Sequence, residues 1–261
     1  MTLVWRPGNN AITDPDALIY IDKVEKADGQ NLEYDVAKAI NDFVVGCKLD
    51  GIWPAIKASC ILAGARTTNG ALIPLVGTAP TPFNFDLVNN TDYNRKTGLV
   101  GDGSTKRIDS NRNSNIDPQN SHHLSVYATT AATSGIYISG ETSGNRNAIY
   151  ATSTNIEISL RSGGSVLSTG ITRNSTGFLA GSRISSSIIN ARVGGSNVSI
   201  SNTSASPPNQ SINVFCQNVS GSTSEFINAR LAFYSIGESL DLAKLDTRVS
   251  ALITAIGAAI P

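Results

Sequence analysis

The sequence predicts a mainly β protein, a two-sheet sandwich preceded by a small helical region and followed by one helix. Only 15% of the 261 residues are charged and 40% are hydrophobic, a composition typical of short strands and turns. Nine of the twenty acidic residues lie in residues 1–50, whereas residues 118–237 contain three, Glu141, Glu157 and Glu225. This change of character predicts a helical domain over 1–66 and a β domain over 67–261.

The first domain is predicted to hold three short helices that share an apolar face. Asp14 can cap the first helix, Pro15 fits its first turn, and the Asp-Gly pair at 28–29 ends it. Apolar residues at steps of three and four predict a second helix within 31–50. A third helix is expected over about 54–65.

The second domain is predicted to consist of short strands, because brief alternating runs are separated by Gly, Asn, Ser and Pro. So many short strands at close spacing favour a sandwich or a jelly roll. After a possible cap at Ser239, apolar residues up to Ile256 predict a terminal helix that covers a sheet face or edge. The expected strands are 71–76, 84–87, 99–100, 105–108, 123–129, 135–139, 148–151, 155–160, 177–182, 187–193, 196–201, 211–216 and 230–236.

The composition also argues against several classes of partner. Twenty basic residues balance twenty acidic ones, so neither nucleic-acid binding nor a polybasic membrane contact is expected. No apolar run has the length of a membrane span, and the N-terminus lacks the pattern of a signal peptide. We therefore expect a protein made in a cytoplasm and not secreted through the general pathway, without membrane insertion.

The cysteines and histidines give no sign of a metal or redox site. Cys47, Cys60 and Cys216 are odd in number and lack C-x-x-C spacing. His122 and His123 begin a predicted strand, so their side chains should point to opposite faces of the sheet. No cofactor is expected.

Three stretches carry a resemblance to a known family. Residues 92–106 (DYNRKTGLVGDGSTK), and residues 111–119 (NRNSNIDPQ) leading into 123–127 (HLSVY), resemble the opening strands of concanavalin A-like, LamG-type jelly rolls. Residues 229–240 (ARLAFYSIGESL) and the helix after them are similar to the closing strand and helix of these modules. Such modules recur in tail and other virion proteins of bacteriophages, including cyanophages.

The resemblance implies a virion structural protein, with a tail fibre or tail-associated subunit as the first choice. The helical region would then attach to other virion proteins, and the jelly roll would face a host-surface glycan. A homo-oligomer is implied, and a trimer is compatible with it. A capsid decoration protein, a free carbohydrate-binding lectin and a glycan hydrolase remain as alternatives.

Hydrolysis requires two carboxylates that converge on a glycosidic bond. Glu157 is the acidic residue of a central predicted strand, and no second acid accompanies it. No G-x-S-x-G elbow is present either. The sequence therefore predicts a protein that is not an enzyme and in which Glu157 lies on a solvent face.

Two sets of residues are candidates for ligand contact. Asp109, Asn111, Asn113, Asn115 and Asp117 alternate along the chain and carry the oxygen atoms that calcium prefers. Ser114 and Asn120 replace the Gly and Glu of an EF-hand loop, so an Asn-rich connection with Asx turns competes with calcium binding.

Sugar recognition commonly uses an exposed aromatic ring. Tyr93, Tyr137 and Tyr150 lie near predicted loops or strand edges and are the candidates for glycan contact. For each tyrosine, packing in the core is the competing interpretation.

Overall fold

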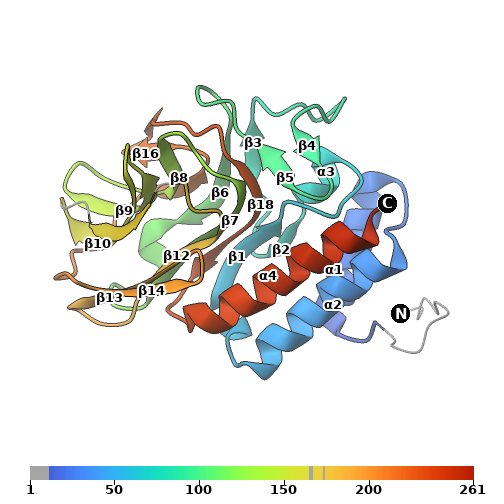
Figure 1. Ribbon diagram of the computed structural model, residues 1–261, viewed down its shortest axis with the longest axis horizontal. Coiled ribbons are helices and arrows are strands. Elements are labelled where there is room, and N and C mark those ends of the chain that lie inside the picture. Colours follow the sequence, from blue (N-terminus) through green and yellow to red (C-terminus); the bar gives the residue numbers. More distant parts are fainter. Residues whose placement is uncertain (1–11, 165–166, 173) are drawn as a thin grey trace.

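A computed structural model describes residues 12–164, 167–172 and 174–261. Two large antiparallel sheets pack face to face, and helices cover the outer face of one of them (Figure 1). The predicted class is confirmed, a β sandwich with helices near the N-terminus and one helix at the C-terminus. No helix of the described residues combines the length and the apolar character needed to cross a membrane.

The sheet beneath the helices has nine strands. Its main path runs, from edge to edge, through β14 (Ser196–Ser201), β13 (Ile188–Val193), β12 (Gly177–Arg183), β7 (His122–Thr130), β18 (Arg230–Gly237), β1 (Ile56–Ile61) and β2 (Pro74–Val76), while β5 (Gly98–Val100) pairs with β18 and with β4 (Tyr93–Asn94).

The second sheet has seven strands, and the long helices that the structure describes pack on the other sheet. Its order is β11 (Ser168–Thr172), β10 (Asn155–Gly163), β9 (Asn145–Ala151), β8 (Gly135–Ser139), β15 (Ser211–Val214), β6 (Arg107–Asn113) and β3 (Thr81–Phe83). A hairpin of β16 (Gln217–Val219) and β17 (Ser222–Ser224) packs beside β8 and β15.

The sandwich interior is formed by alternate residues of facing strands. Leu124 and Val126 of β7 and Ile156 and Ile158 of β10 are fully buried in one apolar cluster. Because side chains alternate along a strand, their neighbours point to the outer faces of the two sheets. This alternation decides which side chains are available to a ligand.

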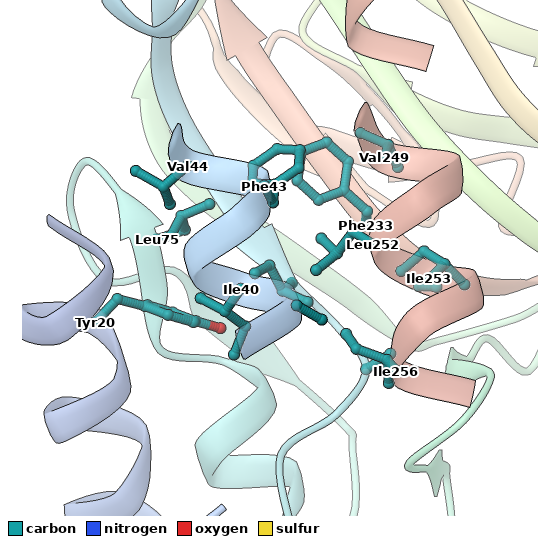
Figure 2. Close-up of a cluster of buried hydrophobic side chains, with 14 of the residues drawn as sticks. Tyr20, Ile40, Phe43, Val44, Leu75, Phe233, Val249, Leu252, Ile253 and Ile256 are labelled. Atoms are coloured by element: carbon teal, nitrogen blue, oxygen red, sulfur yellow. The ribbon is translucent and has the colours of Figure 1, made fainter. Parts of the chain in front are cut away.

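Helices α1 (Pro15–Asp28), α2 (Tyr34–Leu49) and α4 (Leu242–Ala259) form a layer on the nine-stranded sheet. Figure 2 shows Ile40 and Phe43 of α2 and Leu252 of α4 gathered around Phe233 of β18. The remaining helical pieces are α3 (Thr68–Ala71) and the 3-10 turns Trp53–Ala55 and Ser114–Ile116.

The helix ends follow simple capping chemistry. Asp14 accepts hydrogen bonds from the backbone N–H of Asp16 at 3.0 Å and of Ala17 at 3.3 Å, and Gly29 ends α1 with a φ of 65°. This confirms the predicted limits of α1. The terminal helix also covers a sheet face as predicted, although Asp241 and not Ser239 caps it.

The predicted third helix is wrong. Only Trp53–Ala55 forms a helical turn, and Ile56–Ile61 is strand β1 between β18 and β2. Alternate residues of this apolar run are buried on both sides, with Ala58 and Cys60 in the sandwich and Ile61 under the helices. A strand that is buried on both faces has no polar alternation, so its sequence resembles a buried helix.

Strand β1 lies before residue 66, the predicted division between the two domains, but belongs to the same sheet as strands that follow it. Elements from both sides of this position share one sheet, and one apolar cluster joins the helices to that sheet. Several predicted strands have other limits in the structure, and the predicted strand 84–87 is wrong. Residues 84–87 lie in no strand, because Asn84 has a left-handed backbone and the Asp86 carboxylate accepts N–H bonds from Val88 and Asn89 in the turn that follows. The predicted strands do not include β3, β4, β11, β16 or β17.

Candidate functional site

The calcium candidates of β6 are bound to other protein groups. Asp109 accepts hydrogen bonds from the Ser211 hydroxyl and, at 2.8 Å, from the backbone N–H of Asn111. The Asn111 amide donates to the Ala79 carbonyl at 2.8 Å, and that of Asn113 donates to Asn209 at 2.8 Å. The bond between Asp109 and the Asn111 N–H is an Asx turn, the competing interpretation of this segment.

Asp117 lies apart from these residues, in the sandwich interior. It is 3% exposed, and its carboxylate binds the Arg112 guanidinium and, at 3.2 Å, Nδ1 of His122. These contacts hold its pKa well below the usual range despite the opposing effect of burial. Among the described residues, no three His, Cys, Asp or Glu side chains gather as metal ligands would. Calcium binding stays a prediction.

Further buried polar side chains extend from Asp117 between the two sheets. The Asn147 amide donates to Nε2 of His122 at 3.1 Å and to the Ser114 hydroxyl at 2.7 Å. Arg161 is fully buried, and its Nη1 donates to the same hydroxyl at 3.0 Å. Asp117 is therefore the carboxylate that offsets the charges of Arg112 and Arg161 in this part of the interior.

The two histidines point to opposite faces, as predicted. His122 enters the sandwich, and His123 lies under the helices, with Nδ1 2.6 Å from the Glu238 carbonyl and Nε2 2.9 Å from the Ser235 hydroxyl. Because carboxylates and carbonyls only accept hydrogen bonds, Nδ1 carries the proton in both rings. Burial lowers the pKa of His122 to about 3 and that of His123 to about 4. The positive charge of Arg161 is the second cause for His122.

These histidines predict a loss of stability in weak acid. The unfolded chain takes up their protons near pH 6.5, whereas the folded chain excludes them, so each histidine costs stability as the pH falls below that value. We expect each to remove roughly 2–3 kcal/mol by about pH 4. Urea unfolding over this range should show a shallower loss for His123→Gln, and an unchanged slope would contradict the assignment.

The structure separates the three candidate tyrosines. Tyr137 is fully buried, and its hydroxyl accepts the Ala132 N–H at 2.9 Å. Tyr93 is half-buried, and its hydroxyl donates to the Ala65 carbonyl at 2.8 Å. Tyr150 is half-buried on β9 between Ile149 and Ala151, which belong to the interior cluster. Its ring therefore lies on the outer face of the seven-stranded sheet.

Strand pairing places Tyr150 between two glutamates. Tyr150 lies opposite Glu157 of β10 and, on its other side, opposite Ile136 of β8. The Ile136 N–H donates to the Glu225 carbonyl at 2.8 Å, so Glu225 lies next to Ile136. Glu157, Tyr150, Ile136 and Glu225 thus form a row across the sheet. Partial burial raises the pKa of Tyr150, and the charges of Glu225 and Glu157 raise it further.

Arg146 precedes Tyr150 by four residues in β9, so both side chains lie on the same face of the sheet. Burial raises the pKa values of Glu157 and Glu141, and the positive charge of Arg146 acts in the opposite direction and lowers them. The Nε of Arg146 lies 3.4 Å from Oε2 of Glu141, which also accepts from Gln217 at 3.3 Å. Glu141 is 2% exposed, and its Oε1 has no hydrogen-bond partner among the described residues.

The sequence identified Tyr150 but missed most of its surroundings. Glu157 lies on the outer face, as predicted, but it is half-buried opposite the tyrosine and not exposed. The alternation of Arg146 and Tyr150 within one strand could have shown that they share a face. Glu225 joins the row through a contact with a distant part of the chain, which no local pattern indicates.

A separate groove of about 660 Å³ lies between the β13–β14 hairpin and the start of α4. Amide and hydroxyl side chains, among them Asn190, Asn197 and Ser199, line it together with Leu240. The described residues that line this groove include no aromatic side chain. It therefore lacks the ring on which a sugar would stack.

No protein-family model and no curated protein matches the chain. Among solved structures, a mutant of HCR/D is similar, with a TM-score of 0.50 and 13% identity, over 74% of this chain and 51% of that one. Domain 4 of AbnA, an extracellular GH43 arabinanase from Geobacillus stearothermophilus, solved with arabinotriose, has a TM-score of 0.46 and 13% identity, over 74% of this chain and 98% of that one.

The binding domain of botulinum neurotoxin serotype G is similar at a TM-score of 0.44 and 12% identity, over 74% of this chain and 50% of that one. The chain thus spans about half the length of the HCR/D and neurotoxin chains. Identities this low reflect shared architecture alone. The chain has a jelly-roll-like β-sandwich fold.

Proposed function

We propose that the chain is a carbohydrate-binding, lectin-like module whose glycan lies on the outer face of the seven-stranded sheet, over Tyr150. The observation that carries this proposal is the row of Glu225, Ile136, Tyr150 and Glu157 across that face. An aromatic ring offers an apolar surface to the C–H face of a sugar, while carboxylates accept hydrogen bonds from its hydroxyl groups. The row places both kinds of group on one surface.

The spacing of the acids favours binding over hydrolysis. The backbone positions of Glu157 and Glu225 are three strand-to-strand steps apart, about 14 Å at about 4.8 Å per step. Glycosidases that use two carboxyl groups hold them about 5–9.5 Å apart. The Tyr150 ring also stands between these two glutamates, so the proposal includes no catalytic role.

The proposal places this module in a phage virion, as a tail fibre or tail-associated subunit that contacts a host-surface glycan. The resemblance of residues 92–106 and 229–240 to modules of tail proteins supports this context. The helical layer would then contact other virion proteins, and the chain would form a homo-oligomer such as a trimer. Peptide mass spectrometry of purified particles tests this part, and a chain found only outside the particles would contradict it.

Binding at Tyr150 has a direct test. The protein should retain glycans from a broad array, and Tyr150→Ala should weaken calorimetric binding of the best ligand by about tenfold or more. Tyr150→Phe keeps the ring and should retain most of the affinity. Tyr93→Phe is the control on another surface. An array without any bound glycan, or equal affinity for Tyr150→Ala and the wild type, would overturn the proposal.

A further inference from the structure

The charges around Tyr150 restrict the kind of sugar that its face can accept. Glu157 and Glu225 lie on the two sides of the ring, and Glu141, in the segment before β9, contacts Arg146. Arg146 is the cation whose charge acts on Tyr150, Glu157 and Glu141. Two carboxyl groups therefore act on Tyr150, and the nearby Arg146 guanidinium already pairs with a third, that of Glu141.

One nitrogen of the Arg146 guanidinium, Nε, already contacts a carboxyl group. This carboxyl group belongs to Glu141, which is 2% exposed and has one oxygen without a partner in the part of the chain that the structure describes. An anionic sugar over Tyr150 would add a charge beside the half-buried Glu157 and the exposed Glu225. Such like-charge contacts weaken binding most where water is partly excluded.

A cationic sugar meets the opposite conditions. A protonated amine above the ring gains a cation–π contact with Tyr150 and charge-assisted hydrogen bonds to a flanking carboxylate. We infer that the Tyr150 face selects glycans with an unsubstituted, protonated amino sugar, accepts neutral sugars more weakly and rejects acidic sugars. This inference rests on the proposed carbohydrate-binding function.

The test compares three trisaccharides by calorimetry at about pH 6, where a sugar amine is protonated. They are the trimer of glucosamine, its fully N-acetylated form and a trimer of galacturonic acid. The wild type should bind the amino trimer about tenfold or more tightly than the acetylated trimer, and the acidic trimer weakest. Added salt should reduce the preference for the amine.

Two variants connect the preference to the named carboxylates. The double variant Glu157→Gln with Glu225→Gln keeps Tyr150, so it should bind the acetylated trimer as before and lose the preference for the amine. Glu238→Gln is the matched control, because Glu238 pairs with Lys57 at 2.9 Å and its side chain is 42% exposed. Its preference should equal that of the wild type.

The outcomes separate this inference from the function beneath it. Equal or tighter binding of the acetylated or acidic trimer would overturn the inference and leave carbohydrate binding intact. A preference for the amine that survives in the double variant would also overturn it. If neither the trimers nor any array glycan binds, the proposed function fails, and the inference fails with it.

Discussion

Asp117→Asn is expected to lower the free energy of unfolding by about 3–5 kcal/mol at neutral pH. Asp117 is 3% exposed, and its two oxygens bind the guanidinium of Arg112 and Nδ1 of His122. Asparagine removes the negative charge that offsets Arg112 and the fully buried Arg161. A buried cation without its counter-charge costs far more than a lost surface contact.

The matched control is Asp22→Asn, the same chemical change at an exposed ion pair. Asp22 bonds Lys26 at 2.7 Å, and its side chain is 61% exposed. Such a pair contributes less than about 1 kcal/mol. Urea unfolding of both variants at neutral pH gives the comparison. If Asp117→Asn costs no more than Asp22→Asn, the charge balance of the interior has been misassigned.

The Asp117 cluster also marks a limit of sequence-based prediction. The alternation rule correctly placed His122 and His123 on opposite faces, because it concerns one strand alone. The partners of His122 come from β9 and from the segment before β7, and only tertiary packing brings them together. Asp117, the last residue of the Asn-rich stretch with calcium-like spacing, is therefore found as a carboxylate of the interior.

The same distinction explains which parts of the fold were predicted. Strands β8 and β14 and helix α1 were predicted with their observed limits, because local alternation or capping defines them. Strand β1 was predicted as a helix, because burial on both faces removes the alternation. Tyr150 was identified by residue type, whereas Glu225 entered its row through long-range pairing.

Phe233→Ala is the second change for which a large effect is expected, a loss of about 3–5 kcal/mol in the free energy of unfolding. Phe233 is fully buried on β18, and its ring meets Phe43 of α2 edge to face at 5.7 Å. All three long helices contribute to the cluster around it (Figure 2). Removing the ring leaves a cavity where the helical layer joins the sheet.

This variant also tests whether residues 1–66 unfold as a separate domain. Because β1 pairs with β18 and the helices share the Phe233 cluster, helix and sheet signals should be lost together, at one lowered denaturant midpoint. Leu49→Ala is the control: Leu49 is 81% exposed on α2, so its loss should change stability by less than about 0.5 kcal/mol. Two separate transitions in circular dichroism, with only the helical one shifted by Phe233→Ala, would instead support an independent helical domain.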